Sequence, residues 1–447
     1  MKSSISKKLK AIVIMLCATL STQAHIPTKI EQIKAPFEMP QLERPDFPNR
    51  SISIEKTGAK QNKLSTKQIQ KAIDRMAEKG GGVVMVPAGK WITGRIVLKS
   101  NVNLHIDEGA ELHFSGDIKD YLPVVQARYE GVDALSLGGM VYANGAENIA
   151  LTGKGKLVGP DYSCEILTRT EGGVSPELEK IPFEQRIVDG AGGKNVFMPA
   201  FFGAFNCKNI LIEGVTFEHS IFWNIVPTYC ENVIIRGVTV NSHGQVRTDG
   251  IDIDSSVNVL IEYTTLSCGD DCFTLKAGRG NDGMDRNRPT ENVVIRHCTV
   301  KRGVGGIAIG SETAAMIRNV YAHDCVIESA MYPFYMKSRR PRGGGGENVL
   351  FERIHVKKAD RPAIFFDMLG SPNSVGGLGQ RLPKREVNRL TPVFRNFTFR
   401  DITIDDCPTM LRAKGLPESP IENLTLENVK SNNQQVSVQD IGTMIIK

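Results

Sequence analysis

The chain has 447 residues, of which 41% are hydrophobic and 23% are charged, and this is the composition of a soluble globular protein. Its length suits one large domain or two to three ordinary ones. The formal net charge is +6, and it falls to +2 without the four lysines among the first ten residues. A nearly balanced charge gives no reason to expect a nucleic-acid partner.

The first 24 residues are predicted to be a secretory signal peptide. Four lysines precede an apolar stretch over residues 11–20, and the small residues Thr22 and Ala24 follow it. We therefore expect export to the periplasm or the cell exterior, and no membrane contact after the signal is removed. Residues 25–50 hold five prolines and are predicted to form an extended arm.

Eight of the nine cysteines follow the signal peptide, and an oxidising compartment permits disulfides between them. Cys268 and Cys272 have a C-x3-C spacing, which differs from the usual zinc-ligand pairs, and no histidine pair follows at ligand spacing. We therefore predict no metal and no cofactor. The two cysteines fit a disulfide that stiffens their loop, and they fit free stacked thiols equally well.

One helix is predicted, over residues 65–79. Ser65 and Gln68 have the spacing of a capping box, apolar residues follow on one helical face, and the glycines at 80–82 end the helix. The rest of the chain has the pattern of short strands.

A sequence motif with a central asparagine recurs through those strands. It appears as "CKNILIEGVTF", "CENVIIRGVTV", "SVNVLIEYTTL", "TENVVIRHCTV", "IRNVYAHDCVI", "GENVLFERIHV", "FRNFTFRDITI" and "IENLTLENVKS". Consecutive asparagines of this series lie 23 to 48 residues apart, and similar stretches occur earlier around Asn103 and Asn148. A period in the twenties, without the helices or the leucine pattern of other repeats, predicts the coils of a right-handed parallel β-helix.

We therefore predict an all-β fold, with one parallel β-helix domain over residues 51–447. Apolar positions stack inward, and the asparagines form an internal ladder that satisfies backbone groups at a bend. The helix at 65–79 caps the N-terminal end and shields its strand edges from aggregation. The two longest spacings indicate loops inserted at 279–289 and 370–392.

Three aspartates are predicted to converge at one end of one sheet. Asp249 lies two residues before the strand 251–254, and Asp271 lies two residues before the strand 273–276. These are equivalent positions in adjacent coils, and Asp270 is next to them. Because strands of neighbouring coils stack about 4.8 Å apart, the three carboxylates meet.

In the same strands, successive side chains point alternately into the coil and out of it. Apolar residues point into the coil, so the predicted outward residues are Asp252, Asp254, Thr274, Lys276, Tyr335 and Lys337.

A cluster of carboxylates raises at least one pKa towards neutrality, because like charges repel. A protonated acid beside ionised carboxylates is what the cleavage of a glycosidic bond requires. Turn-forming aspartates or a calcium site are the alternatives to a catalytic cluster.

The segments "RTDGIDIDSS", "CGDDCFTLKAG", "RGVGGIAIGSE" and "FYMKSRRPRGG", taken in order, resemble glycoside hydrolase family 28, the polygalacturonases and their relatives. The stretch "GGGVVMVPAGKWITGRIVLKSNVNLHIDEGAEL" is similar to the opening coils of that family. The resemblance implies a right-handed parallel β-helix that hydrolyses pectic polysaccharide with inversion and without a metal.

The resemblance also implies roles for individual residues. Asp270 is similar to the general acid, and Asp249 and Asp271 are similar to the pair that holds and activates the attacking water. Lys337 is similar to the lysine that binds a galacturonate carboxylate.

Three positions depart from the family pattern. Arg247 replaces the asparagine of Asn-Thr-Asp, Val304 replaces the histidine of Gly-His-Gly, and Tyr335 replaces the arginine of Arg-Ile-Lys. The acids are kept while the substrate-holding residues differ. A rhamnogalacturonan or an oligogalacturonide is therefore a candidate substrate beside plain polygalacturonate.

Basic residues near the acids are candidates for substrate binding. Arg339, Arg340 and Arg342 have the planar guanidinium that pairs with uronate carboxylates, and a solvated loop is the alternative for the last two. Arg247 either binds a substrate carboxylate or offsets local negative charge. His243 either replaces the missing histidine or lies in a surface turn.

Two other functions remain open at this stage. One is a pectate-lyase-like polysaccharide lyase whose carboxylates bind calcium, because the fold alone does not exclude it. The other is a non-catalytic carbohydrate-binding β-helix, which Val304 and Tyr335 allow. The expected partner is a pectic polysaccharide or oligosaccharide, and the chain is expected to act as a monomer.

Overall fold

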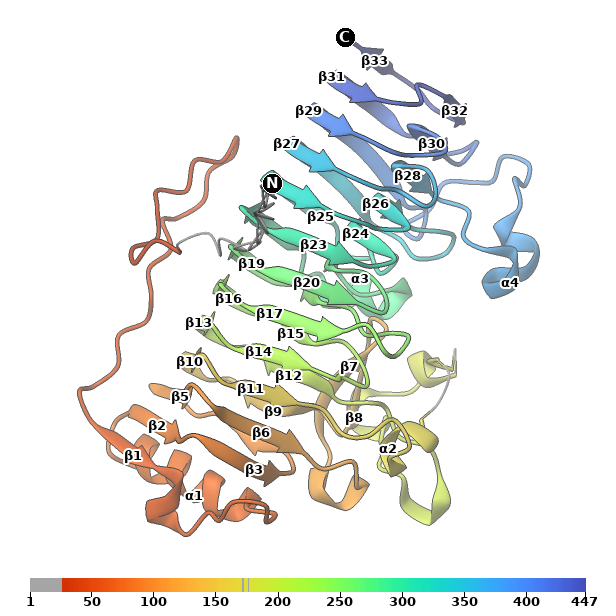
Figure 1. The fold of residues 1–447 in the computed structure, drawn as a ribbon. Helices are drawn as coiled ribbons and strands as arrows, with labels where there is room; N and C mark the ends of the chain where they lie inside the picture. Colours follow the sequence, from red (N-terminus) through yellow and green to blue (C-terminus); the bar gives the residue numbers. More distant parts are fainter. Residues whose placement is uncertain (1–25, 171–172, 176) are drawn as a thin grey trace, which may run out of the picture.

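The computed structural model describes residues 26–170, 173–175 and 177–447. The predicted signal peptide, residues 1–24, lies outside the described residues. Short strands stack in parallel along one axis, from β1 near one end of the molecule to β33 at the other (Figure 1). The chain is a parallel β-helix, as predicted.

The eleven-stranded sheet carries the acid cluster described below. Its strands pair in parallel in this order: β4 (Ile96–Val97), β9 (Gly139–Asn144), β12 (Ala200–Phe205), β15 (Ile225–Thr228), β18 (Ile251–Asp254), β21 (Phe273–Lys276), β24 (Gly305–Ile309), β26 (Tyr332–Lys337), β28 (Ile364–Asp367), β30 (Leu411–Lys414) and β32 (Val436–Gln439).

A twenty-stranded sheet forms the other two sides of the coil, as two rows that merge at β25. One row contains β1 (Ser51–Ser53), β2 (Gly82–Val86), β5 (Val102–Ile106), β10 (Glu147–Gly153), β13 (Lys208–Glu213), β16 (Glu231–Arg236), β19 (Val257–Glu262), β22 (Thr290–Arg296), β25 (Ile317–Ile327), β27 (Gly345–Val356), β29 (Val393–Ile404), β31 (Glu422–Ser431) and β33 (Met444–Ile446). The other row contains β3 (Gly89–Thr93), β6 (Ala110–Phe114), β11 (Lys156–Val158), β14 (Thr216–Glu218), β17 (Thr239–Ser242), β20 (Thr265–Cys268) and β23 (Thr299–Arg302).

Helix α1 (Thr66–Glu78) packs against β1 to β5 at the N-terminal end of the coil, where it was predicted. Its predicted apolar face is buried, but the capping box is wrong. The Ser65 hydroxyl makes no cap hydrogen bond and instead donates to the Lys63 carbonyl and accepts from the Lys60 amide. The loop before the helix therefore takes the hydroxyl that a cap would use.

The remaining helical segments are short. They are α2 (Glu165–Thr168), α3 (Gly280–Arg286) and α4 (Pro372–Val375), with 3-10 turns at Ile54–Thr57, Ile118–Tyr121, Leu178–Lys180, Phe183–Gln185, Ala191–Gly193 and Gly376–Gly379. The predicted insertions at 279–289 and 370–392 contain α3 and α4.

The predicted asparagine ladder is present at one bend of the coil. Each amide nitrogen donates to the amide oxygen of the asparagine one coil earlier, so the side chains bond to one another rather than to the backbone. Every member has a positive φ, which asparagine tolerates better than most residues. The ladder begins at Asn101, so the earlier assignment near Asn103 is off by two residues.

An antiparallel hairpin was not anticipated. Strands β7 (Val125–Tyr129) and β8 (Val132–Ser136) meet at Glu130 and Gly131, which both have positive φ as a two-residue hairpin turn requires. Figure 1 shows the hairpin and the segment with α2 beside the N-terminal coils, and α4 beside the C-terminal coils.

The proline-containing arm, residues 26–50, has no helix or strand and lies along the outer face of the twenty-stranded sheet (Figure 1). Apolar arm residues such as Leu42 pack on outward residues of six strands, from Ala150 on β10 to Tyr321 on β25. The Arg236 and Arg296 guanidinium groups donate to arm carbonyls. In the described part of the chain, no helix has the length and apolar character needed to cross a bilayer.

Candidate active site

The three aspartates lie at bends that lead into adjacent strands. Asp249 precedes β18, and Asp270 and Asp271 precede β21. The Gly250 amide donates to the Asp271 carbonyl oxygen at 2.8 Å, so the backbone pairing between neighbouring coils continues through the bends. One oxygen from each carboxylate lies within 4.8 Å of the others. Coil stacking therefore brings the three acids together, as predicted.

Glycines make room for this arrangement. A Cβ on Gly305, one coil further along, would lie 2.4 Å from the Asp271 Oδ1 atom. A Cβ on Gly250 would lie 2.6 Å from the Cys272 carbonyl oxygen. Both contacts are too close for any side chain, so these positions require glycine.

The three acids differ in exposure. Asp249 is 3% exposed and Asp271 is 1% exposed, whereas Asp270 is partly open to solvent. Asp270 is therefore the carboxyl group of the cluster that an external molecule reaches first.

Two lysines supply positive charge on either side of the cluster. The Lys337 Nζ lies 2.5 Å from Asp271 Oδ2. The Lys276 Nζ lies 3.7 Å from Asp249 Oδ2 and 3.3 Å from Glu312 Oε2. The cluster is thus a network of alternating charges rather than bare carboxylates.

Burial sets the protonation of Asp270 and Asp249. Burial first, and then the neighbouring Asp271 charge, raise the pKa of Asp270, while Lys337 opposes that rise. Burial, followed by the charges of Asp252 and Asp270, raises the pKa of Asp249 well above its usual range. A proton is therefore retained in the cluster at a pH where an exposed aspartate would have lost it.

Asp252 and Asp254 point outward as predicted, but they are not accessible. Both are 0% exposed, and the Asp252 Oδ1 lies 3.6 Å from the Lys276 Nζ. The hairpin Arg128 lies with its Nη1 at 3.1 Å from Asp254 Oδ1. Burial raises the pKa of Asp252 to about 8, with the Lys276 charge opposing. Outward in a coil therefore does not mean solvent-facing.

Arg247 and Tyr335, two of the positions that depart from the family pattern, contact different neighbours. The Arg247 Nη1 lies 3.4 Å from Glu130 at the hairpin tip and donates to the Tyr129 hydroxyl. Tyr335, on β26, has the Lys337 ammonium 4.6 Å from its ring centroid.

Val304, the third such position, lies directly beside the acids, because its amide donates to the Asp270 carbonyl oxygen. His243 lies elsewhere. It is exposed, and its Nδ1 lies 3.1 Å from the Cys268 carbonyl oxygen, with no contact to the three acids among the described residues.

The arginines of "KSRRPR" separate into two groups. Arg340 and Arg342 are buried and pair with Glu418 and Glu312, so the solvated-loop alternative is wrong for both. Arg339 is partly exposed and has no carboxylate within ion-pair distance in the described chain. Of the three, Arg339 alone keeps its charge available to a ligand.

The cysteines of the Asp270 loop are free. Cys268 and Cys272 are both buried, and all eight cysteines in the described residues are unpaired. The alternative of stacked thiols is therefore the one that the structure supports.

Sequence reasoning missed the residues that connect the cluster to its surroundings. Lys276 was placed outward but given no function, and Glu312 was not considered. The Lys276 Nζ also lies 4.4 Å from the centroid of the buried Trp223 ring. A lysine at an outward position one coil beyond two outward aspartates was the available signal.

The outward face of the eleven-stranded sheet is closed on one side of the cluster. Beneath the hairpin, the outward residue Val226 on β15 is 4% exposed and Thr228 is 0% exposed. On the other side, Arg412 on β30 and Ser437 on β32 are exposed. The acids therefore lie between a covered half of the sheet and a half that opens towards the C-terminal coils, where Phe365 on β28 is still only 6% exposed.

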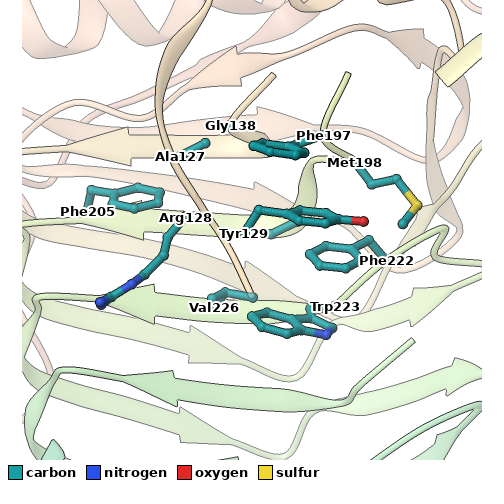
Figure 2. Close-up of a pocket in the computed structure, with 12 residues that line it drawn as sticks. Ala127, Arg128, Tyr129, Gly138, Phe197, Met198, Phe205, Phe222, Trp223 and Val226 are labelled. Atoms are coloured by element: carbon teal, nitrogen blue, oxygen red, sulfur yellow. The ribbon is translucent and has the colours of Figure 1, made fainter. Parts of the chain in front are cut away.

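Aromatic rings fill the covered half. Figure 2 shows Phe197, Tyr129, Phe222 and Trp223 lying one over another, with successive ring centroids 4.5, 4.7 and 4.8 Å apart. The cavity beside them holds about 10 Å³, which is close to the space of one water molecule. This cavity has no room for a sugar.

The comparisons with known proteins agree with the site. A model of the glycosyl hydrolases family 28 matches residues 186–375. A probable polygalacturonase of Vitis vinifera is 27% identical over 372 residues, which cover 82% of this chain and 70% of that protein. An exo-poly-alpha-D-galacturonosidase of Dickeya chrysanthemi is 27% identical over 383 residues, covering 79% of this chain; the match spans 62% of that enzyme, less than two thirds.

A solved structure extends the match to the whole fold. The hyperthermoactive exopolygalacturonase of Thermotoga maritima is 27% identical, has a TM-score of 0.76, and covers 91% of this chain and 94% of its own. A right-handed β-helix with this acid cluster and these relatives is a glycoside hydrolase. Within that class, the chain is similar to the polygalacturonases of family 28.

Proposed function

We propose that this protein hydrolyses galacturonic-acid-containing pectic polysaccharide from a chain end. The observation that supports attack at a chain end is the closure of the sheet face on one side of Asp270 by the hairpin and its aromatic stack. A polymer cannot continue past the acids in that direction. Two of the relatives above are named as exo-acting on galacturonan.

The chemistry follows from the exposure and charge of the acids. Asp270 donates its proton to the glycosidic oxygen as the bond to the anomeric carbon breaks. Asp249 and Asp271 hold a water molecule that attacks this carbon and gives up its proton to the pair. The Lys276 charge favours the ionised form of Asp249, which is the form that accepts the proton of the water. The products are a hemiacetal and an alcohol.

Inversion at the anomeric carbon is part of the proposal, and it rests on the family resemblance rather than on spacing. The acid oxygens lie within 4.8 Å. Inverting enzymes usually separate their carboxyl groups by about 6.5–9.5 Å. Proton NMR of the first-formed product tests inversion, because a retained anomer would contradict it.

The substrate is tested by incubating the protein with polygalacturonate and with rhamnogalacturonan and separating the products by chromatography. Monomer or dimer released from polygalacturonate at the earliest times is the expected result. A ladder of intermediate lengths would contradict attack at the chain end. Release from rhamnogalacturonan alone would favour the substrate suggested by Arg247, Val304 and Tyr335, the three positions that depart from the family pattern.

A calcium-dependent lyase is the alternative that the acid cluster itself suggests. Three carboxylates within 4.8 Å supply the oxygen ligands that such a cation prefers. However, Lys337 and Lys276 lie against two of the three acids and already supply positive charge there. Full activity in a chelator, and a product without ultraviolet absorption, are expected; the opposite results would establish the lyase.

We further propose that the protein is exported and acts as a monomer. Export rests on the signal-peptide pattern of residues 1–24. Fractionation of the producing cells tests the first point, and light scattering of the purified protein tests the second.

A further inference from the structure

A groove along helix α1, at the N-terminal end of the coil, gathers positive charge far from the acids. We propose that this groove, which we call the α1 groove, is a second binding site for an acidic polysaccharide and holds the protein on its polymer. The inference rests on the proposed function only for the choice of polymer, because the groove lies outside the active site.

The α1 groove has a volume of about 1100 Å³. Residues of α1 line one side, and residues within 95–99 and 119–122 line the other. Six cations and three carboxylates are among the lining residues, so the formal charge of the groove is +3. This exceeds the +2 that remains over the whole chain without its four N-terminal lysines. The positive charge of the molecule is therefore concentrated here.

Three of the cations form a stripe on the outer face of α1. Lys67, Lys71 and Arg75 recur every four residues, so they share one face and span about 12 Å of the helix axis. All three are exposed, and none has a carboxylate within ion-pair distance in the described residues. Because like charges at this spacing repel one another, the stability of the helix does not explain the stripe.

The other side of the groove adds further positive charge. The Lys99 Nζ lies 3.3 Å from the Asp74 Oδ1 and so neutralises one acid of α1. The Arg95 guanidinium donates to the carbonyl oxygens of Leu137 and Pro123, and it has no carboxylate within ion-pair distance in the described chain. An anion in the groove would therefore meet unpaired cations on both sides.

Charge and shape together identify the ligand class. A hollow suits an extended chain better than a flat membrane surface, and the apolar face of α1 is buried against the coil, so the helix has none to insert into lipid. Two exposed leucines, Leu64 and Leu122, line the groove and suit the carbon–hydrogen faces of sugar rings. A chain of sugars that carry carboxylates therefore fits better than an anionic membrane.

The groove is separate from the acid cluster. Val97 on β4 lines the groove, and β18 is the fourth strand beyond β4, so roughly 19 Å of sheet separate them. The hairpin spans this distance: Val125 on β7 and Val97 pack against the same aromatic cluster, and Glu130 at the hairpin tip pairs with Arg247. The groove therefore binds another segment of the polymer, or another chain, than the one at the acids.

The triple variant Lys67→Ala/Lys71→Ala/Arg75→Ala tests the proposal through polymer length. KM for polygalacturonate should rise about three- to tenfold, because exposed ion pairs with the polymer are lost. The value of kcat, and KM for the galacturonate dimer, should stay unchanged, because a dimer at the acids does not reach the groove. Added salt should raise KM for the polymer more in the unaltered protein than in the variant. The melting temperature should not fall, because alanine favours the helix.

Lys208→Ala/Lys357→Ala/Lys430→Ala is the matched control, because it removes the same charge from exposed positions outside the groove. It should leave KM unchanged for the polymer and the dimer. Equal KM for polygalacturonate in the two triple variants would overturn the proposal. So would an equal rise of KM for polymer and dimer in the groove variant, because the stripe would then act on the active site.

Binding without turnover separates this proposal from the proposed function. If the protein hydrolyses no galacturonan, its retardation in a native gel that contains polygalacturonate measures binding alone. Weaker retardation of the groove variant than of the control variant would support the groove. Equal retardation of both, or of neither, would overturn it. Binding to vesicles of anionic phospholipid that requires the stripe, without such binding to polygalacturonate, would overturn the choice of ligand.

Discussion

The two halves of the eleven-stranded sheet place polar residues at equivalent outward positions with opposite results. In the covered half, Asp254 is buried with Arg128, and Lys276 is buried with Glu312. In the open half, Arg412 and Lys414 lie without a carboxylate partner among the described residues. Desolvation explains the difference, because a buried charge requires a partner and a solvated one does not.

The contrast shows that the coil alone does not determine where a ligand binds. Both halves have the same strand spacing and the same alternation. The hairpin β7–β8, which lies outside the repeat, turns one half into protein interior and leaves the other as surface. The acids lie at the border, with Asp270 on the accessible side.

Removing the proton donor at this border should have the largest effect. Asp270→Asn keeps the shape of the side chain but cannot donate a proton to the glycosidic oxygen, so kcat should fall about 10³-fold. Reducing-end assays on galacturonan measure this loss. The melting temperature should stay near that of the unaltered protein, and activity within a fewfold of normal would contradict the assignment of the acid.

Removing a buried cation should lower the folding stability of the covered half. Lys276→Met leaves Asp249, Asp252 and Glu312 without their shared positive charge, which should lower the free energy of unfolding by about 3–5 kcal/mol. Urea denaturation measures the change. Lys414→Met is the control in the open half, where the change should stay within about 0.5 kcal/mol. Equal losses in the two variants would erase the distinction between the halves.

A pH profile tests the charge balance around Asp270. Lys337 opposes the rise of the Asp270 pKa, so Lys337→Met should raise that pKa further. The acid then stays protonated to a higher pH, and the alkaline limb of the kcat profile should move upward. Lys337→Arg keeps the charge and should leave the limb in place. Movement of the limb to lower pH in Lys337→Met would show that Asp270 is not the titrating acid.

The smallest effect is expected in the asparagine ladder, away from both halves. Asn258 has a φ of +57°, and its amide bonds to Asn232 and Asn292. Asn258→Ala loses these bonds and places alanine at an unfavourable φ, which should cost about 1–3 kcal/mol of stability. Thermal unfolding measures it. Asn258→Gly relieves the backbone part of this cost, so a glycine variant less stable than the alanine variant would be the contrary result.

The repeat made the coil and the acid cluster predictable. The sequence motif around each asparagine indicates which residues stack on one another in neighbouring coils. Asp249 and Asp271 therefore converge although they are 22 residues apart. These contacts join only adjacent coils, so the spacing of the repeat in the sequence indicates directly which residues are neighbours.

Contacts outside the repeat were not predictable in the same way. Arg340 pairs with Glu418, 78 residues later, and nothing in the sequence marks the two as partners. The Ser65 cap failed because a neighbouring loop competes for the hydroxyl. The hairpin had a local signal, Glu130-Gly131 between "VQARY" and "VDALS", but its position over the sheet depends on tertiary contacts.

The N-terminal arm changes how this molecule should unfold. In a solenoid each coil contacts only its neighbours, so coils separate independently from the ends. The arm contacts six strands, from β10 to β25, which links coils that would otherwise be independent. The central coils should therefore open together as one cooperative unit, and the acid cluster belongs to this unit.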